Sequence, residues 1–323
     1  MAPKTKPRIP PDWHLRARLK ARQLALLVAI AEHRSLRRAA AEVAVSQPAA
    51  TRLLAELEDA LGVRLFERAS WGMQPTPYGD TLIRYARGML TDLAEARDEI
   101  AALAAGATGR LRVGAETGAV PRLLTPALRD VREGRPGLRV FVLVNTSDVL
   151  VAALRQGTLD VALGHLPARA DAAEFDVVPL RTDPLCAVVR AGHPLAHGRR
   201  VSAAALAGVP WILHPPDSGM RDEAGAFLAR ASIRPGGDLV ETVSIVATLA
   251  LLETTDAATV LPQDLAEHYA AQGLLARLPL RVPPGGGTVT DLITRRSRQL
   301  SPAAQALVAA LRQVAAAPRL RAS

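Results

Sequence analysis

The chain has 323 residues, of which 49% are apolar and 22% charged, and its formal net charge is +9. This composition is typical of globular proteins, and the length suits about two or three domains with a substantial core. A single cysteine, Cys186, excludes an intrachain disulfide framework and a multi-cysteine zinc module. The first residues lack the apolar run of a signal peptide, and no segment approaches the roughly 18 apolar residues of a membrane span. We therefore expect a cytoplasmic protein with no membrane partner.

The positive charge is concentrated near the N-terminus. Residues 1–90 hold 15 basic and 8 acidic side chains, whereas the rest of the chain holds 25 and 23. A localised basic region is typical of a protein that binds a polyanion such as nucleic acid. A genome that favours arginine would instead raise the basic count throughout the chain.

The first elements after a basic, proline-rich arm over residues 1–20 read as a helix-turn-helix. The apolar periodicity and the caps predict helices over 23–33, 36–43 and 47–61. Ser35 and Ser46 are typical N-caps, Pro48 suits a first helical turn, and Gly62 ends the third helix. Two short helices joined by a tight turn, the second opened by small polar residues, form this DNA-binding motif.

A small wing and a long helix follow. Residues 63–68 alternate like a strand, 69–73 form a turn, and Gln74-Pro75 leads out of it. Thr76-Pro77 then begins a helix that we expect to reach about Leu103. Its apolar positions step by four and three, the pattern of a coiled coil, at Leu82, Ala86, Met89, Leu93, Ala96, Ile100 and Leu103. A helix packing only on its own domain would show a broader apolar stripe, so we predict dimerisation through this helix.

Beyond a linker of small residues over 104–109, strands alternate with helices. Strands are predicted over 111–115, 138–144, 160–164, 185–190, 211–213, 239–242, 258–261 and 289–294. Helices are predicted over 120–133, 147–156, 220–231, 245–253 and 302–316. This alternation indicates an α/β fold with largely parallel sheets, and the segment is long enough for two lobes with a cleft.

Several motifs resemble the LysR-type transcriptional regulators. The N-terminal ones are Ala39-Ala-Ala-Glu42, Val45-Ser-Gln-Pro-Ala-Ala-Thr-Arg52 and Leu57-Glu-Asp-Ala-Leu-Gly-Val-Arg-Leu-Phe-Glu-Arg68. Asp160-Val-Ala-Leu-Gly164 and Gly192-His-Pro-Leu-Ala196 are similar to the effector-binding domain of that family. The wing exit Gly72-Met-Gln-Pro-Thr-Pro-Tyr-Gly79 is similar to the subgroup named for a galactose-binding-protein regulator. Trp71-Gly72 stands where most members have basic residues, which puts a phosphate contact of the wing in doubt.

The resemblance implies three regions: an all-α winged helix-turn-helix domain over 1–75, a linker helix and hinge over 76–108, and an effector-binding domain over 109–323. The last would have two periplasmic-binding-protein-like lobes, the first over 109–183 and 282–323 and the second over 184–281. The implied function is transcription regulation by a homodimer or homotetramer. The implied partners are promoter DNA, a small-molecule effector and RNA polymerase, with no resident cofactor.

The N-terminal turns of the third helix hold the candidate base-reading side chains. Such turns enter the major groove, where the amide of Gln47 suits adenine and the guanidinium of Arg52 suits guanine or a phosphate. Helix N-termini and arginines also hold phosphates. The candidate DNA-binding residues are Arg37, Arg38, Ser46, Gln47, Pro48, Thr51, Arg52 and Arg68. The alternative for this stretch is a helix cap with a polar exposed face.

The candidate effector site lies where strands end and helices begin, because ligands of α/β folds meet free helix N–H groups there. The residues are Thr117, Gly118, Thr146, Ser147, Ser218, Arg221, Thr242 and Ser244. Each turn alone is more often a plain helix cap, but four such turns placed alike in two lobes, at loops to which the family resemblance also points, favour a ligand site. Arg221 favours an anionic effector unless it is simply solvated, whereas the wing resemblance favours a sugar. His165 faces either this ligand or a structural partner.

Other patterns give no catalytic or metal site. Pro194 breaks the helix that zinc binding by His193 and His197 would need, and the glycines over 285–287 lack the Lys-Ser/Thr of a phosphate loop. The chain has no Gly-x-Ser-x-Gly elbow. We therefore predict a ligand-responsive regulator and no enzyme. The alternatives are a DNA-tethered enzyme, which turnover would reveal, and an architectural DNA-binding protein whose footprint no small molecule alters.

Overall fold

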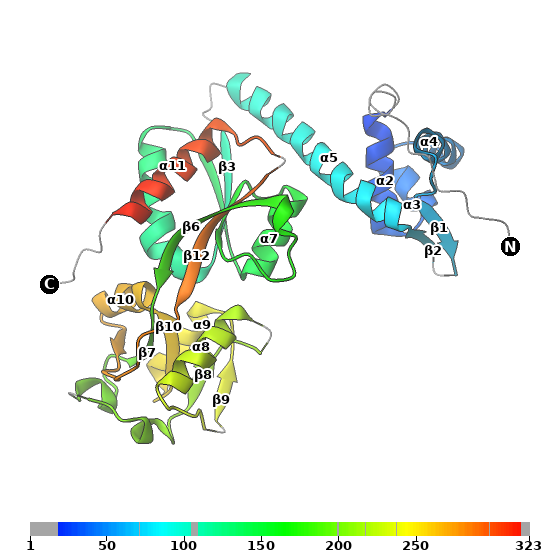
Figure 1. Ribbon diagram of the computed structural model, residues 1–323. Helices are drawn as coiled ribbons and strands as arrows, with labels where there is room; N and C mark the ends of the chain where they lie inside the picture. The colour runs from blue at the N-terminus through cyan, green and yellow to red at the C-terminus, as the bar shows by residue number, and fades with distance from the viewer. Residues whose placement is uncertain are drawn as a thin grey trace. The chain divides into compact units, whose positions relative to one another are not determined.

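The computed structural model describes residues 19–70, 72–104, 109–198, 200–216, 218–236, 238–296 and 298–317 (Figure 1). Most of the basic arm expected over 1–20, the linker residues 105–108 and Trp71 therefore lie outside the described residues. The chain forms two compact units. The first runs to Ala105 and includes Arg155–Thr158, and the second holds residues 106–154 and 159–323.

The first unit is built from four helices and a two-stranded wing in the described residues. These are α2 (Ala21–His33), α3 (Leu36–Glu42), α4 (Gln47–Leu61), β1 (Phe66–Ala69), β2 (Gly72–Pro75) and α5 (Pro77–Ala104). The caps lie where the sequence places them: the Oγ atoms of Ser35 and Ser46 accept from the N–H groups of Arg38 and Ala49. Gly62 ends α4 in the left-handed region, at φ 68°. Leucines of α2 and α4, among others, fill the core of this unit.

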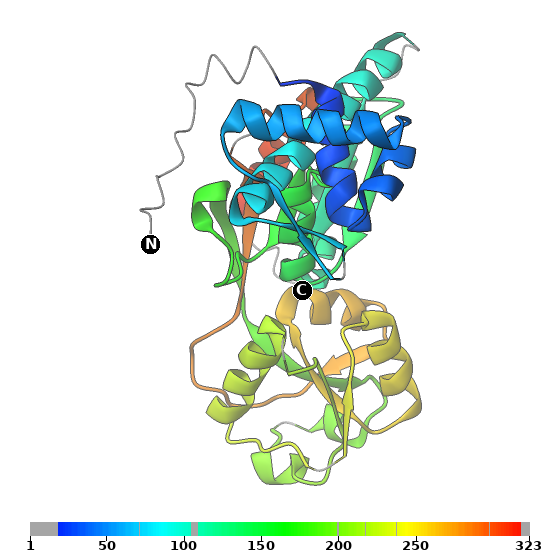
Figure 2. The ribbon, with the colours of Figure 1, turned by 90° about the vertical axis from the view of Figure 1, so that its right-hand side faces the viewer.

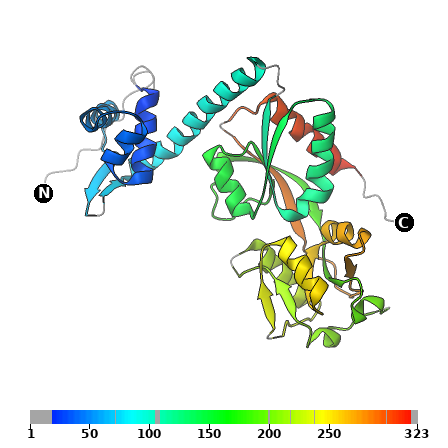
Figure 3. The same cartoon turned by 180° about the vertical axis from the view of Figure 1, so that it is seen from behind.

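The second unit contains two lobes, each with one five-stranded sheet. The first sheet has the order β4-β3-β5-β12-β6. Its strands are β3 (Arg110–Ala115), β4 (Arg139–Val144), β5 (Val161–Gly164), β6 (Phe175–Asp183) and β12 (Thr288–Arg295). Helices α6 (Thr125–Glu133) and α11 (Pro302–Ala316) share a core on one face, and α7 (Ser147–Gln156) packs on the other (Figure 3).

The second sheet has the order β11-β7-β10-β8-β9. Its strands are β7 (Leu185–Arg190), β8 (Trp211–Leu213), β9 (Leu239–Glu241), β10 (Ala258–Pro262) and β11 (Leu275–Arg277). Helix α8 (Gly219–Arg230) covers one face, and α9 (Ile245–Thr254) and α10 (Gln263–Ala271) cover the other (Figure 2). Short helical turns complete the unit at Thr117–Ala119, Val120–Leu124, Ala172–Glu174, Pro194–His197 and Ala203–Leu206.

The α/β class is confirmed, but the expectation of largely parallel sheets is wrong. Both sheets are mixed, because β12 runs antiparallel to β5 and β6, and β7 runs antiparallel to β10 and β11. The prediction also lacked β6, β11 and α10, and the helix expected over 120–133 begins with an irregular turn before α6. Strand direction depends on partners far along the chain, which local hydrophobic periodicity does not encode.

The chain crosses between the lobes twice, once after β6 and once before β12. These two crossings lie side by side. A Cβ atom added to Gly287 would be 2.7 Å from the carbonyl oxygen of Asp183. Among the described residues, no helix is both long and apolar enough to span a bilayer.

Candidate DNA-binding surface and effector cleft

Helix α4 presents the candidate base-reading side chains to solvent. Gln47, Thr51 and Arg52 are all exposed on its first turns. Thr51 donates its hydroxyl hydrogen to the Gln47 carbonyl at 3.1 Å, and the Ser46 hydroxyl caps the Ala49 N–H at 3.4 Å. Within the described part of the chain, the side chains of Gln47 and Arg52 have no polar partner. They are therefore available for an external ligand without breaking an internal contact.

The remaining DNA candidates lie on neighbouring elements of the same unit. Arg37 and Arg38 are exposed on α3, Pro48 is exposed in the first turn of α4, and Arg68 is exposed on β1. Exposed guanidinium groups around a helix N-terminus suit phosphate oxygens. This arrangement provides positive charge beside the base-reading turn of α4.

The wing is fixed by two contacts that the sequence did not reveal. The buried carboxylate of Glu58 accepts from the N–H groups of Leu65 and Phe66, at 2.7 and 3.3 Å, and thus ties α4 to β1. Gly72 has φ 115°, and a Cβ atom there would lie 2.3 Å from the Arg34 carbonyl oxygen. The next residue, Met73, donates its N–H to that oxygen at 2.9 Å. The wing is therefore held against the turn between α2 and α3.

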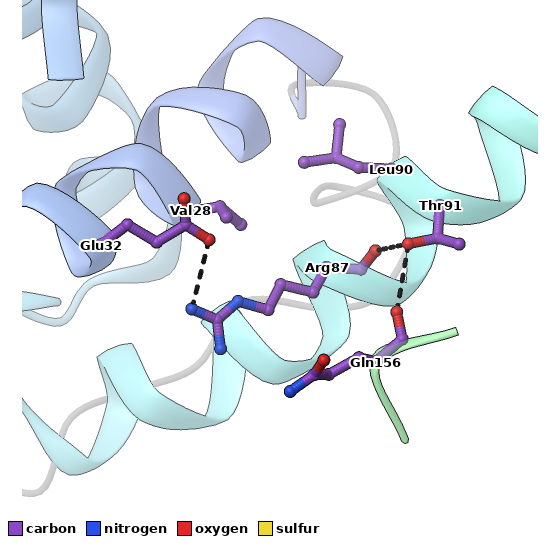
Figure 4. Close-up of a pocket in the computed structure, with 6 residues that line it drawn as sticks. All are labelled: Val28, Glu32, Arg87, Leu90, Thr91 and Gln156. Carbon is purple, nitrogen blue, oxygen red and sulfur yellow. Dashed lines mark hydrogen bonds and ion pairs between the residues drawn. The ribbon is translucent and has the colours of Figure 1, made fainter. Parts of the chain in front are cut away.

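The beginning of α5 packs on its own unit. This is the alternative to a coiled-coil seam that the sequence analysis considered. Ala86 is fully buried, and Leu82 lies partly buried against the same core. Arg87 pairs with Glu32 of α2 at 3.5 Å (Figure 4). The Thr91 hydroxyl donates to the Arg87 carbonyl at 2.9 Å in the same view. These two predicted seam positions therefore have an intramolecular role.

Further along α5, apolar side chains are exposed. The exposed fractions are 49% for Met89, 59% for Leu93 and 67% for Ile100, and Ala96 is exposed on the same helix. The side chain of Leu103 lies outside those that the structure describes. Large apolar side chains in a row on one helix are typical of an association surface.

In the first lobe, Ser147 is an internal hydrogen-bonding residue. Its side chain is 2% exposed, and its hydroxyl donates to Glu116 Oε1 at 2.7 Å. The hydroxyl oxygen of Ser147 also accepts from the His165 N–H at 2.9 Å. A Cβ atom on Gly164 would lie 2.4 Å from it, so a larger residue at position 164 would displace this hydroxyl. The structure therefore gives Ser147 internal partners in place of the free hydroxyl expected from the sequence.

In the second lobe, the predicted hydroxyls act mainly as caps. Ser218 accepts from the Arg221 N–H at 3.2 Å, and Ser244 accepts from the Ala247 N–H at 3.3 Å. Thr242 Oγ1 accepts from the Ser244 N–H at 3.0 Å. Asp217, next to Ser218, lies outside the described residues.

Arg221 has two partners in its own lobe. Its Nη1 atom lies 2.8 Å from Glu241 Oε1 and 2.6 Å from the carbonyl oxygen of His214. The guanidinium charge is thus already balanced by a carboxylate, and the expected clamp for an anion is occupied.

Thr117, Gly118 and Thr146 lie at the ends of neighbouring strands β3 and β4. Thr117 belongs to a cavity of about 250 Å³ between the lobes. The cavity is lined by Thr117, Val120, Pro121, Thr125, Val144, Ile245, Leu265, His268 and Tyr269. Gly118 packs on Pro262 of the other lobe, and the N–H group of Thr146 donates to Asn145 Oδ1 at 2.8 Å. We call this region the apolar end of the cleft.

A cluster of titratable side chains, which we call the polar end, lies at the ends of β3, β5 and β8 and in β12 beside the end of β5. Its members are Glu116, His165, His214 and Asp291, of which only His165 was considered from the sequence. The hydrogen bond to Glu116 raises the pKa of His165, whose Nδ1 lies 3.3 Å from Glu116 Oε1. Burial lowers the pKa of His214 and raises that of Asp291. The His165 ring lies 3.1 Å from the position of a Cβ atom on Gly219, so this cluster meets the second lobe.

Metal and thiol chemistry have little support in the described residues. These residues contain no group of three or more His, Cys, Asp and Glu side chains placed to hold a metal ion. Instead of pairing with His197, His193 accepts the Leu195 N–H on Nδ1 at 3.0 Å. Burial raises the pKa of the Cys186 thiol to about 12, which disfavours the reactive thiolate.

Comparison with known proteins identifies related sequences that match most of the chain. Two family models match: the bacterial regulatory helix-turn-helix protein, lysR family, over residues 21–80, and the LysR substrate binding domain over residues 104–316. The HTH-type transcriptional regulator GbpR of Azospirillum brasilense is 40% identical over 310 residues, which are 94% of this chain and 89% of GbpR. The regulator PcaQ of Agrobacterium fabrum is 33% identical over 298 residues, 92% of this chain and 96% of PcaQ.

A solved structure of full-length CbnR in complex with its target DNA is also similar. The TM-score is 0.61 at 26% identity, and the match covers 92% of this chain and 100% of CbnR. The similarity thus includes the helix-turn-helix, the long helix and both lobes.

Proposed function

The chain belongs to the LysR family of DNA-binding transcriptional regulators, and from this premise we propose that α4 reads its operator and that the cleft binds a small polar metabolite. Family membership makes the protein a regulator with an effector-binding domain and removes the DNA-tethered enzyme as an alternative. The substrate-binding model over residues 104–316 argues against a purely architectural DNA-binding protein.

The proposal for DNA reading rests on one observation: Gln47 and Arg52 are exposed and unpaired, within the described residues, on the first turns of α4. In a major groove, Gln47 would face adenine and Arg52 guanine or a phosphate. Thr51 and Pro48 would make close contacts beside them. Arg37, Arg38, Arg68 and the N-terminus of α4 at Ser46 would hold phosphates.

LysR regulators act as oligomers on promoter DNA, and we assign the dimer contact to the exposed part of α5. Met89, Leu93, Ala96 and Ile100 would form it, with Leu103 extending it. Two such pairs would make a homotetramer. We propose a DNA-binding domain over 1–75, a linker helix and hinge over 76–108, and an effector-binding domain over 109–323. We also propose that the protein acts in the cytoplasm, where its promoter lies, and that RNA polymerase is a further partner.

We propose that the effector binds in the cleft between the two lobes. The residues of this cleft would have roles that differ from those expected from the sequence. Thr117, Gly118 and Thr146 in the first lobe and Thr242 in the second would border the ligand. Ser147, Ser218 and Ser244 would shape the site through the backbone groups that they cap. The metabolite would favour one arrangement of the assembled DNA-binding domains, which is what an effector must do to change transcription. No other cofactor is needed for this function.

The test is a footprint on operator DNA selected in vitro, followed by affinities at fixed salt concentration. Gln47→Ala and Arg52→Ala should each weaken specific binding by about 1–3 kcal/mol, or about 5- to 150-fold, and relax the base preference. Arg132→Ala, which removes an exposed arginine of α6, is the matched control and should leave affinity unchanged. Unchanged affinity and base preference in both α4 variants would refute the proposed reading.

A further inference from the structure

Arg34 occupies a backbone position that favours glycine. It follows α2 and has φ 51° and ψ 23°, in the left-handed region. Only three non-glycine residues of the described chain have a positive φ, and the other two, Ala44 and Ser232, have small side chains. A side chain crowds the backbone in this conformation, so helices that end in it usually do so with glycine or asparagine. A long charged side chain is therefore present here despite a conformational cost.

The backbone of Arg34 joins α2 to the wing. Its N–H group donates to the Ile30 carbonyl at 2.8 Å, which closes the last turn of α2. Its carbonyl oxygen accepts from the N–H group of Met73 in the wing at 2.9 Å. The next residue, Ser35, is the N-cap of α3. These contacts explain the left-handed conformation, but they make no use of the guanidinium group.

The side chain of Arg34 is exposed and has no polar partner among the described residues. The acidic residues that precede and follow it most closely along the chain are engaged elsewhere. Glu32 pairs with Arg87 at 3.5 Å, and Glu42 pairs with His33. The guanidinium group therefore adds no polar contact within the described part of the unit, and its charge is available to an external anion.

The position of Arg34 in the unit indicates which anion this is. A Cβ atom added to Gly72 would lie 3.5 Å from the Arg34 Cβ, so the side chain of Arg34 begins against the wing. Arg68 of β1 lies opposite Met73, the residue that donates to the Arg34 carbonyl. In a helix-turn-helix the first helix crosses the phosphate backbone of DNA, and α3, which begins two residues after Arg34, is that helix here. Arg34 therefore lies where α3 and the wing would approach phosphates.

The turn of the wing has no positive charge of its own, since residues 69–73 read Ala-Ser-Trp-Gly-Met. We propose that Arg34 supplies the phosphate contact of the wing, its guanidinium donating to a phosphate oxygen of the DNA backbone. The conformational cost of an arginine at this position is thus offset by affinity for DNA of any sequence. This inference rests on the proposed contact of α4 with DNA and adds a backbone contact outside that helix.

The experiment measures the affinity of the full-length protein for two DNA duplexes of equal length over a range of KCl concentrations. One duplex carries the operator selected in vitro, and the other carries a scrambled sequence. A phosphate contact releases condensed counterions whatever the sequence, and each contact contributes about −0.9 to the slope of log K against log salt concentration. We expect Arg34→Gln to weaken binding to both duplexes by about three- to tenfold for each bound protomer, and to reduce the slope by about one.

Three further variants separate the charge from the backbone conformation. Arg34→Lys keeps the charge and should keep the salt dependence of the parent protein. Arg34→Gly removes the guanidinium and suits the left-handed backbone, so it should weaken DNA binding without lowering the melting temperature. Arg132→Gln removes an exposed positive charge from α6 and should change neither affinity nor salt dependence.

The outcomes distinguish this contact from base reading by α4. Parent-like affinity and salt dependence in Arg34→Gln and Arg34→Gly would overturn the contact, whatever Gln47→Ala and Arg52→Ala show. A loss confined to the operator duplex would mean that Arg34 acts on base recognition, and it too would overturn the phosphate contact. If the Arg34 variants lose affinity for both duplexes while the two α4 variants keep the base preference of the parent protein, the phosphate contact stands and the proposed reading by α4 is wrong.

Discussion

The DNA-binding surface and the effector cleft differ in what their polar side chains already do inside the folded protein. On α4, Gln47 and Arg52 are exposed and have no polar partner in the described structure. In the cleft, Ser147 and Arg221 are engaged by neighbouring residues. A recognition helix can leave its side chains free because its backbone hydrogen bonds are internal. Strand ends and helix N-termini instead need caps, and the nearest hydroxyls supply them.

The largest expected effect is that of Gly72→Ala. It tests whether the DNA-binding unit is stabilised by a contact between residues far apart in the chain, as well as by helix caps. Gly72→Ala places a Cβ atom 2.3 Å from the Arg34 carbonyl oxygen, on a residue with φ 115°. We expect a loss of about 2–4 kcal/mol in the free energy of unfolding, because strain and displacement of the wing add together. Urea denaturation and operator affinity measure the effect.

The matched control is Gly225→Ala in the interior of α8, where an added Cβ atom meets no described atom within 4 Å beyond its chain neighbours and the backbone of its own helix. That substitution should stabilise the second unit by about 0.5–1 kcal/mol, since alanine favours helix more than glycine does. Equal effects of the two substitutions would show that the contact between the wing and Arg34 contributes little to stability.

The same contrast explains how much could be predicted from the sequence. Ser35, Ser46 and Gly62 mark helix ends through contacts within a few residues, so the helix-turn-helix and its exposed residues followed from the pattern. The pairing of Asp291 with Gly164 joins positions far apart in the chain. The polar end of the cleft depends on such pairings, so the sequence indicated only His165 among its residues. The directions of β7 and β12 depend on long-range pairing in the same way.

The second prediction concerns the exposed part of α5. Leu93→Glu places like charges against each other if two copies pack through this surface. We expect the dimer dissociation constant to rise by about 10- to 100-fold, with weaker binding to a two-half-site operator. Sedimentation measures the assembly. Ala94→Glu, one position away on the helix, is the control, and an equal effect of both variants would place the contact elsewhere.

The third prediction separates a structural Ser147 from a ligand-binding one. Ser147→Ala removes the hydrogen bond to Glu116 and leaves the His165 N–H without its acceptor. We expect a loss of about 1–3 kcal/mol in the free energy of unfolding. The exposed cap Ser202→Ala should cost about 0.5–1 kcal/mol. An unaltered unfolding curve for Ser147→Ala, together with weaker effector binding, would restore Ser147 as a direct ligand contact.

The smallest expected effect is the pH dependence at the polar end of the cleft. Because Glu116 raises the pKa of His165 above its ordinary value of 6.5, the folded protein binds this proton more tightly than the unfolded chain does. The stabilising contribution is therefore complete below the ordinary value and is lost as the pH rises through the folded pKa. His165→Gln should lower the melting temperature more at about pH 5.5 than at about pH 8.5.

The half-buried His214 gives the opposite slope, because its lowered pKa makes protonation on acidification favour the unfolded chain. Only the difference between His165→Gln and its parent therefore isolates the His165 contribution. Repeating the comparison in a Glu116→Gln background should flatten the pH dependence, since Glu116 is its main cause and Asp291 and Glu223 contribute less. A dependence of the same size in that background would mean that those two carboxylates hold the proton on His165.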